Sequence, residues 1–341
     1  MAINPIYTAS RRPEWDIEAM AQGLIAGDRG ALSRSITLVE SQRSADLSPA
    51  AALLERVAQL QKSALGRCFR LGITGNPGAG KSTLIEALGQ QWVAQGHRVA
   101  VLAIDPSSTA SHGSILGDKT RMESLARLPE AYIRPSPSSG TLGGIHAHSH
   151  EVLSLFEFEA AGFDRIMIET VGIGQNETSV QTVVDFTLLI ALPGAGDEVQ
   201  GLKRGVMEAA DQIWVNKSDG DRITAAQQTK SQLAQVIGLF HREDGWTVPI
   251  QSGSAIEATS IALLLEALEK GFQWGIATGR TETRRKDQQT AIFQQQVQRG
   301  LWQLIEDDPK LLSHQKEIQE GRITPRKARL EFLRDFMAKY R

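Results

Sequence analysis

The feature that most constrains the fold is a series of short apolar runs, each of which ends in a polar or glycine-rich loop. The runs are CFRLGIT (68–74), RVAVLAID (98–105), DRIMIE (164–169), DFTLLIAL (185–192), DQIWVNK (211–217) and TVPIQSGSA (247–255). Stretches of helical length lie between most of them. This pattern is typical of buried parallel strands with helices on both faces. The sequence therefore predicts an α/β fold with a largely parallel sheet, and ligands of such folds bind at the carboxyl ends of the strands.

A glycine-rich loop follows the first run and predicts a phosphate site. The segment GNPGAGKST (75–83) fits the pattern G-x-x-x-x-G-K-[ST] between a strand and a helix. Its glycines let backbone N–H groups converge on phosphate oxygens, and the helix start adds its positive dipole end. A glycine-rich turn without a ligand is the alternative, which the complete motif disfavours. The predicted nucleotide-binding residues are Gly75, Asn76, Pro77, Gly78, Ala79, Gly80, Lys81, Ser82 and Thr83.

Two side chains of this loop have specific predicted roles. We expect Lys81 to bridge the β- and γ-phosphates of the nucleotide. We expect the hydroxyl of Ser82 to bind Mg²⁺, because hard oxygen ligands suit that ion.

The tetrapeptide NKSD (216–219) at the end of a later run predicts that the base is guanine. The carboxylate of Asp219 can accept hydrogen bonds from guanine N1–H and from the exocyclic amine, and adenine offers neither in that arrangement. We expect Asn216 and Lys217 to hold the loop and to pack on the base.

A small-residue loop, QSGSAI (251–256), is a softer candidate for closing over the guanine. Its backbone groups could contact the base, whereas an ordinary turn between a strand and a helix is the alternative. The residues concerned are Ser254, Ala255 and Ile256.

Carboxylates after other runs are candidates for holding Mg²⁺. Asp105 and Glu169 each end an apolar run, and the longer side chain of Glu169 suits a contact through water. Asp118 lies in the loop SILGDKTRM (114–122), which could order around the γ-phosphate and loosen when that group leaves. The alternative for Asp118 is the N-cap of a following helix.

The stretch after Glu169 predicts slow hydrolysis. The N–H of Gly172 can bond the γ-phosphate, but Ile173 follows it and cannot orient a water molecule. Since positioning and charge stabilisation supply nearly all the catalysis of phosphoryl transfer, the unaided rate should be low. In the loop PGAGDEVQGLKRG (193–205), Lys203 or Arg204 could supply the missing charge, and a solvated loop is the alternative. The predicted catalytic residues are Lys81, Glu169, Gly172 and Lys203.

Composition narrows the class of protein. The 341 residues are 41% hydrophobic and carry a net charge of −2, which gives no indication of nucleic acid or of an anionic membrane. No run approaches the ~20 apolar residues of a membrane helix, and the N-terminus lacks a signal-peptide core. We therefore expect a cytoplasmic protein. With Cys68 as the single cysteine, no intrachain disulfide can form.

Helical spacing marks both ends of the chain. Near the N-terminus, a segment is expected to begin with Ser48 as its N-cap and Pro49 at its first position. From about residue 280 the chain is charged and glutamine-rich, and a last helix is expected from Thr324 through Phe336. We interpret two basic clusters in this part as solvated helix faces. They are Arg284, Arg285 and Lys286, and Arg326, Lys327 and Arg329.

These observations predict a helical extension over 1–62, a P-loop domain over 63–279 and a helical arm over 280–341. The combined motifs GNPGAGKST, AIDPSS, GSILGDKTRM, IETVGIGQNE, LPGAGDEVQGLKRG and NKSD resemble those of the MeaB/ArgK-type GTPases. These methylmalonyl-CoA mutase-associated proteins are relatives of the nickel-insertion and signal-recognition GTPases, within the SIMIBI class of P-loop GTPases. The resemblance covers most of the chain, including ITLVES (36–41) and, more loosely, the C-terminal arm.

The resemblance implies a P-loop NTPase fold, binding of GTP or GDP with Mg²⁺, and a homodimer made by the C-terminal arm. It implies a chaperone that gates adenosylcobalamin loading and protects or reactivates a B12-dependent acyl-CoA mutase, either methylmalonyl-CoA mutase or a close relative. A cobalamin adenosyltransferase is a second implied partner. Hydrolysis would be weak alone and stimulated by the mutase. Switch segments would map to 105–118, 169–175 and 192–205, which favours a partner-sensing role for Lys203.

Two other functions stay open on the sequence. The segment GGIHAHSH (143–150) places His146, His148 and His150 two residues apart, and a nickel or zinc metallochaperone GTPase would need such ligands. Two or three imidazoles without thiolates make a weak metal site, so a surface helix is favoured. A P-loop kinase of a transport protein is the other alternative, and NKSD disfavours it because kinases seldom need a guanine-reading loop.

Overall fold

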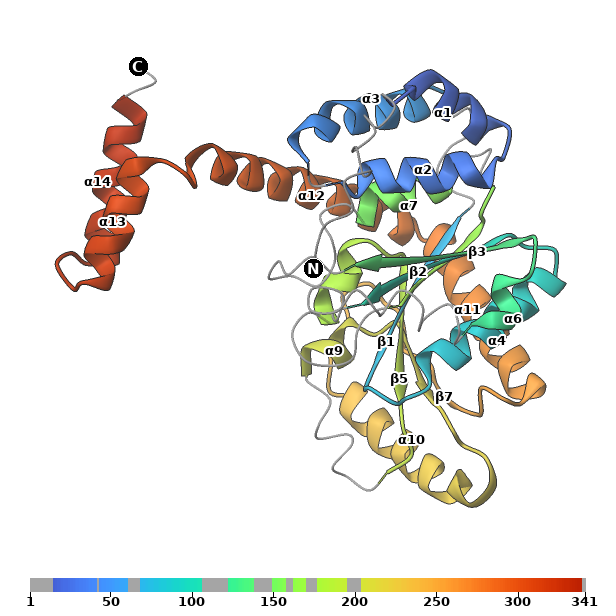
Figure 1. Cartoon of the computed structure of the whole chain (residues 1–341). Coiled ribbons are helices and arrows are strands. Elements are labelled where there is room, and N and C mark those ends of the chain that lie inside the picture. The colour runs from blue at the N-terminus through green and yellow to red at the C-terminus, as the bar shows by residue number, and fades with distance from the viewer. Residues whose placement is uncertain are drawn as a thin grey trace, which may run out of the picture. The chain divides into compact units, whose positions relative to one another are not determined.

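The computed structural model describes residues 15–41, 43–60, 68–105, 122–137, 149–157, 162–169, 177–194 and 204–338. The chain forms two compact units, Met1–Arg285 and Lys286–Arg341 (Figure 1). The first unit holds the sheet and the second holds helices.

Within the described residues, the sheet of the first unit has seven strands in the order β3-β2-β4-β1-β5-β6-β7. Every strand pairing in it is parallel. The strands are β1 (Phe69–Gly75), β2 (Val99–Asp105), β3 (Ala131–Pro137), β4 (Arg165–Glu169), β5 (Phe186–Ala191), β6 (Gln212–Val215) and β7 (Ile250–Ser252). The predicted parallel α/β fold is thus confirmed.

The edge strand β3 is absent from the predicted runs. Its sequence, AYIRPSP, carries Arg134, Pro135 and Pro137, so it does not read as a buried strand. Proline is tolerated at a sheet edge because one side of an edge strand has no ladder to complete. The neighbouring, largely apolar strand β2 pairs with β3 along the whole length of β3.

Helices cover both faces of the sheet, as Figure 1 shows. Helices α4 (Lys81–Ala94), α6 (Glu123–Ala126) and α11 (Ala258–Ala277) share one core with it. On the other face, α1 (Ile17–Ile25), α2 (Arg29–Val39), α3 (Ser44–Leu60) and α7 (Ser149–Glu157) pack over β2 and β4. Helices α9 (Arg204–Ala209) and α10 (Ile223–Ile237) pack over β5 and β6 on this second face. Short 3₁₀ turns η2 (Glu177–Thr182) and η3 (Gly220–Arg222) complete the unit.

Alternation along the strands assigns each side chain to a face. In β5, Leu188 and Ile190 belong to the core under α4 and α11, whereas Leu189 and Ala191 belong to the core under α9 and α10. Because side chains of a strand point alternately to opposite faces, a largely apolar run is expected when both faces are covered. All residues of β5 are buried accordingly.

The start of α3 differs from the prediction. The helix begins at Ser44, so Ser48 is not its N-cap and Pro49 lies inside its first turns. A proline there removes one backbone donor and one intrahelical hydrogen bond. Upstream, Asp46 accepts hydrogen bonds from Trp15 Nε1 at 2.8 Å and from Ser41 Oγ at 2.6 Å, and these contacts hold the early turn in place.

The interpretation of Arg284 and Arg285 as a solvated face was wrong. Helix α12 (Arg280–Ile305) begins in the first unit, and these side chains meet buried carboxylates that stand directly before β5 and β6. Arg285 binds Asp185 through Nε at 2.8 Å and Nη2 at 2.6 Å. Arg284 Nη1 lies 2.9 Å from Asp211 Oδ2. The helix start is therefore bound to the amino ends of two central strands.

The second unit contains the rest of α12 with α13 (Pro309–Gln319) and α14 (Pro325–Ala338). The last helix has Pro325 at its first position, one residue after the Thr324 at which it was predicted to begin. Asp308 caps α13 by accepting from Lys310 N, and Lys310 Nζ lies 2.7 Å from Asp335 Oδ2 of α14. Among the described helices of both units, none combines the length and apolarity needed to cross a membrane.

Candidate nucleotide-binding site

The phosphate loop connects the central strand β1 to the first turn of α4. Gly75 ends β1 with φ +151°, and a Cβ at this position would collide with the backbone oxygen of Ile190. Gly80 has φ +88°, and a Cβ there would lie 2.7 Å from Asn216 Nδ2. Both positions therefore require glycine, for the backbone conformation and for close approach of a neighbouring segment.

The start of α4 is suited to an anion. Its N-cap residue is Gly80, which has no side chain and so cannot cap the amide groups of the first turn. Those groups carry the positive end of the helix dipole. The loop and the helix start together form the cradle that phosphate groups require.

Lys81 lies over the loop, where its amine donates to Gly75 O at 3.0 Å and to Asn76 O at 3.3 Å. Burial lowers the pKa of Lys81, while the negative charge of Glu169 acts in the opposite direction. The lysine thus holds its positive end next to the cradle. A phosphate oxygen would replace the neutral carbonyl acceptors by a negatively charged one, which forms a stronger hydrogen bond with the ammonium group.

Ser82 and Glu169 meet beside the loop. Glu169 ends β4, which pairs with β1 and aligns Glu169 with Ile73. Ser82 Oγ donates to Glu169 Oε1 at 2.9 Å. A hydroxyl and a carboxylate are oxygen ligands of the kind that Mg²⁺ prefers, so this pair fits the predicted metal role.

The structure describes less of the other predicted metal and switch residues. Asp105 ends β2, whose Ala103 aligns with Glu169, so its backbone reaches the same edge of the sheet. Asp118, Gly172 and Lys203 lie outside the described residues, and their roles stay predictions. Neighbouring Arg204 begins α9, where its guanidinium pairs with Glu208 at 2.8 Å.

Asn216 joins the predicted base-reading loop, NKSD (216–219), to the phosphate loop. Its Nδ2 donates to Ala79 O at 2.7 Å. Its Oδ1 accepts from Trp214 Nε1 and from Ala255 N, each at 3.2 Å. Lys217 adds a second connection, because its Nζ donates to Gly78 O at 2.8 Å. The segments predicted to bind phosphate and base are therefore bonded to each other directly.

Asp219 stands at the end of this loop, in extended conformation before η3, and caps nothing with its side chain. The loop behind it is held by Ser218, whose N–H donates to Gly253 O at 3.1 Å and whose hydroxyl donates to Val215 O at 2.7 Å. The carboxylate of Asp219 is thus presented on a fixed backbone, as reading a base requires.

The second loop predicted to contact the base follows β7 and carries Ser254, Ala255 and Ile256. Ser254 and Ala255 are buried, whereas Ile256 is 78% exposed. The N–H of Ala255 is engaged by Asn216, so in this structure it holds the two loops together. Contact of these residues with guanine stays a prediction. The contact between Trp214 and Asn216 was not foreseen, although residues two apart in a strand share a face.

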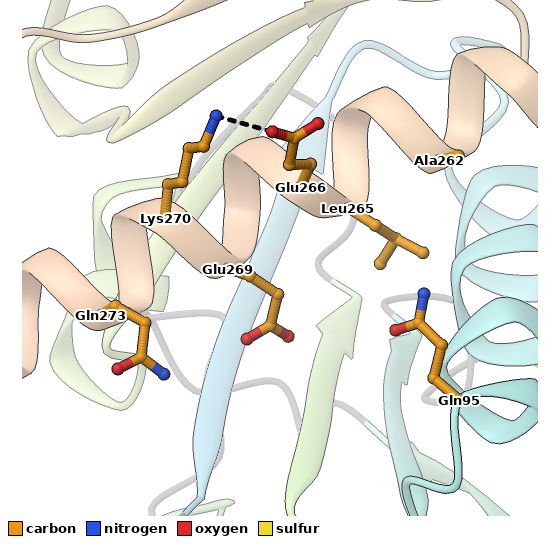
Figure 2. Close-up of a pocket in the computed structure, with 7 residues that line it drawn as sticks. All are labelled: Gln95, Ala262, Leu265, Glu266, Glu269, Lys270 and Gln273. Carbon is orange, nitrogen blue, oxygen red and sulfur yellow. Dashed lines mark ion pairs between the residues drawn. The ribbon is translucent and has the colours of Figure 1, made fainter.

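A separate pocket of about 530 Å³ lies between the end of α4 and the outer side of α11 (Figure 2). The length of α4, which has 14 residues, is ~21 Å and separates this pocket from the phosphate loop. Its charged groups are paired within the protein, as for Glu266 with Lys270 at 2.7 Å and Glu269 with Arg165 at 2.9 Å. The phosphate-binding motif lies at the loop and not at this pocket, so the loop remains the predicted nucleotide site. The lining residues are Gln95, Ala262, Leu265, Glu266, Glu269, Lys270 and Gln273.

The histidine segment is described only from Ser149 onward. His150 lies in the first turn of α7, and burial, followed by the charge of Arg70, lowers its pKa. His146 and His148 lie outside the described residues. Within those described, no group of three or more His, Cys, Asp and Glu side chains could hold a metal ion.

Comparison with known proteins agrees with this geometry. Residues 32–310 match the family model described as methylmalonyl Co-A mutase-associated GTPase MeaB. The chain is 44% identical over 322 residues to a probable GTPase of Mycobacterium tuberculosis, with 93% of this chain and 94% of the relative covered. It is 37% identical over 335 residues to the mitochondrial methylmalonic aciduria type A homolog of Mus musculus, with 95% and 80% covered.

Among solved structures, the chain is similar to one described as LAO/AO transport system kinase, with a TM-score of 0.73 and 30% sequence identity. The likeness covers 96% of this chain and 100% of that one. It extends over both the sheet and the helical parts of the chain.

Proposed function

Because this chain belongs to the methylmalonyl Co-A mutase-associated GTPase family, we propose that it binds and hydrolyses GTP as the chaperone of an adenosylcobalamin-dependent acyl-CoA mutase. The observation that carries the proposal is the direct bonding of the NKSD loop to the phosphate loop. Asn216 and Lys217 each donate to a backbone oxygen of that loop. A kinase without guanine selectivity has no need for this connection.

The residues of the site divide the work on the nucleotide. The amides of the loop and Lys81 bind the phosphates, and Asp219 accepts from the guanine edge. Ser82 and Glu169 would hold Mg²⁺, which when bound neutralises charge on the phosphates. Asp105 and Asp118 are further candidates for holding the ion, directly or through water.

Hydrolysis is proposed to be slow until the partner docks. Ile173 next to Gly172 cannot align a water molecule, so positioning has to be supplied from elsewhere. We infer that Lys203 enters the site in the complex and adds positive charge at the γ-phosphate. Arg204 is less suited, because it pairs with Glu208 and lies over the ring of Phe240.

The mutase is proposed as partner from the family, whose name refers to methylmalonyl Co-A mutase. We propose that the chain gates delivery of adenosylcobalamin to the mutase and protects or reactivates that enzyme. A cobalamin adenosyltransferase would be a second partner in the same delivery.

The experiment that tests these partners is affinity capture with the tagged chain in the presence of GTP, GDP or no nucleotide. Nucleotide-dependent recovery of an acyl-CoA mutase is expected, and capture of none from cells that contain one would contradict the role.

A homodimer through the C-terminal helices is also proposed. In the second unit, α12 exposes large apolar side chains, with Phe293 65% and Leu304 71% exposed. Apolar surface of this kind indicates a protein interface. Sedimentation should give a dimer for the parent and more monomer for Phe293→Glu, whereas a monomeric parent would contradict the proposal.

A phosphate-transfer assay on the purified chain distinguishes the proposed GTPase from the kinase alternative. Incubation with GTP or ATP labelled at the γ-phosphate should release inorganic phosphate. Stoichiometric transfer of the label to a protein or small molecule would favour a kinase instead.

A further inference from the structure

Trp214 lies in the buried strand β6, two residues before Asn216, which begins the NKSD loop (216–219). Its side chain is 1% exposed and belongs to the core under α4 and α11, together with Ala79 and Ala255. An aliphatic residue or a phenylalanine could fill an apolar position of that kind. The indole differs from them by one N–H donor, and this donor is used.

The N–H of Trp214 selects the orientation of the Asn216 amide. It donates to Asn216 Oδ1 at 3.2 Å, and Ala255 N donates to the same oxygen. On the other side, Asn216 Nδ2 must face the carbonyl of Ala79. If the amide turned over, its NH₂ group would face two donors and its oxygen would face an acceptor. Three buried partners therefore hold one orientation, and the indole is the only side chain among them.

The ring of Trp214 also supports the second base-reading loop. A Cβ built on Gly253 would lie 2.7 Å from Trp214 Cζ2 and nearer still to Cη2, so the ring lies directly against the backbone there. Gly253 is bonded to the neighbouring segment on both sides: its N–H donates to Val215 O, and its oxygen accepts from Ser218 N, each at 3.1 Å. The indole thus contacts the loop that carries Asp219 through Asn216 and the loop after β7 through Gly253.

We propose that Trp214 is a positioning residue for guanine recognition, which acts by holding Asn216 and Gly253 and touches no ligand itself. The inference rests on the proposed function, because it presupposes that this site reads guanine. Preorganised loops bind a base without first being ordered, and the ordering otherwise subtracts from affinity. Loss of the indole N–H leaves Asn216 Oδ1 with one donor, so only the backbone groups of Ala255 and Ala79 still hold the orientation of the amide.

The test is Trp214→Phe, with Trp92→Phe as the matched control. Trp92 is equally buried and also donates its N–H to a side chain, Glu269 Oε1 at 3.1 Å, but lies in α4 beside the remote pocket. Calorimetry would give the Kd values for GTP, GDP and ATP with Mg²⁺, and thermal melting would report stability. We expect Trp214→Phe to weaken GTP and GDP binding by about tenfold and to lower the GTP/ATP preference several-fold. Trp92→Phe should lower the melting temperature similarly and leave that preference unchanged.

The outcomes separate this inference from the function on which it rests. If the parent protein does not prefer GTP over ATP, the proposed function fails and the inference fails with it. If the parent prefers GTP and Trp214→Phe retains the same ratio, or both variants change it equally, the inference alone is overturned and the indole is a core residue.

A second variant covers the case in which Trp214→Phe does not fold. Gly253→Ala adds a Cβ that must displace the ring, while the backbone there is one that alanine can adopt. The same loss of GTP/ATP preference is expected, and an unchanged preference would overturn the inference.

Discussion

Replacement of Asp211 by asparagine should destabilise the first unit strongly, because this carboxylate has four donors and no exposure. The side chain is 0% exposed. Its Oδ1 faces the guanidinium groups of Arg242, at 2.9 Å, and of Arg280. Its Oδ2 accepts from Thr187 N and from Arg284 Nη1, each at 2.9 Å.

The size of the loss in stability follows from the hydrogen bonds that an asparagine amide can still accept at that position. Asparagine keeps one oxygen and turns an NH₂ group toward two donors, so two of the four hydrogen bonds are lost. Hydrogen bonds to charged groups contribute roughly 1.5–3 kcal/mol each. Removal of one partner of a buried ion pair costs about 3–5 kcal/mol. The two lost hydrogen bonds give a loss of about 3–6 kcal/mol in the free energy of unfolding, and the broken ion pair gives about 3–5 kcal/mol.

The effect has a defined dependence on pH. Burial alone would raise the pKa of Asp211, but Arg284 and Arg280 outweigh it and hold the pKa below its ordinary value of 3.8. A group with a depressed pKa in the folded state stabilises the protein above the unfolded pKa, and that contribution is lost as the pH falls through the folded pKa. The difference in the free energy of unfolding between the parent and Asp211→Asn should therefore have its full size at pH 7. It should become smaller below about pH 3.8.

The assay is urea unfolding at pH 7 and at acid pH, followed by circular dichroism and tryptophan fluorescence. At constant slope, the shift of the midpoint gives the change in stability. Asp221→Asn, at an exposed carboxylate of η3, is the control and should change stability by less than ~0.5 kcal/mol. A midpoint of Asp211→Asn equal to that of this control at pH 7, or a difference that persists undiminished in acid, would refute the reasoning.

Three predictions concern the nucleotide site. Lys81→Ala should weaken GTP binding by roughly 10–100-fold in titration calorimetry while the melting temperature is retained, because a charge-assisted bond to phosphate is lost; an unchanged Kd would contradict the phosphate role. Asp219→Asn should reduce the GTP/ATP ratio of affinities by about tenfold or more, since an amide cannot accept from both guanine donors, and an unaltered ratio would indicate another base reader. Gly80→Ala should weaken GTP binding more than Gly78→Ala: both have positive φ, which strains alanine by ~1–2 kcal/mol, but only the Cβ at Gly80 meets Asn216 Nδ2, at 2.7 Å. Equal Kd values for these two glycine variants would show that the contact with Asn216 is unimportant.

The sequence by itself determined the parts of this protein that are contiguous in the chain. The phosphate loop could be read from one nonapeptide, because the glycines, the lysine and the hydroxyl that act together there are neighbours. Strands with both faces covered are largely apolar, so β1, β2, β4, β5 and β6 could be recognised without any partner. The predicted position of ligands at the carboxyl ends of the strands rests on this parallel topology.

The tertiary structure alone decided the contacts between distant segments. Arg285 and Asp185 are 100 residues apart, and nothing local distinguishes an arginine that meets a buried carboxylate from one that faces water. Edge position permits the prolines of β3, and edge position is a property of the sheet. Asn216 joins Ala79 across 137 residues, and the orientation of its amide depends on Trp214 and Ala255. Local periodicity reports which side of an element is buried, whereas the identity of the group that each polar side chain meets is set only when the chain closes on itself.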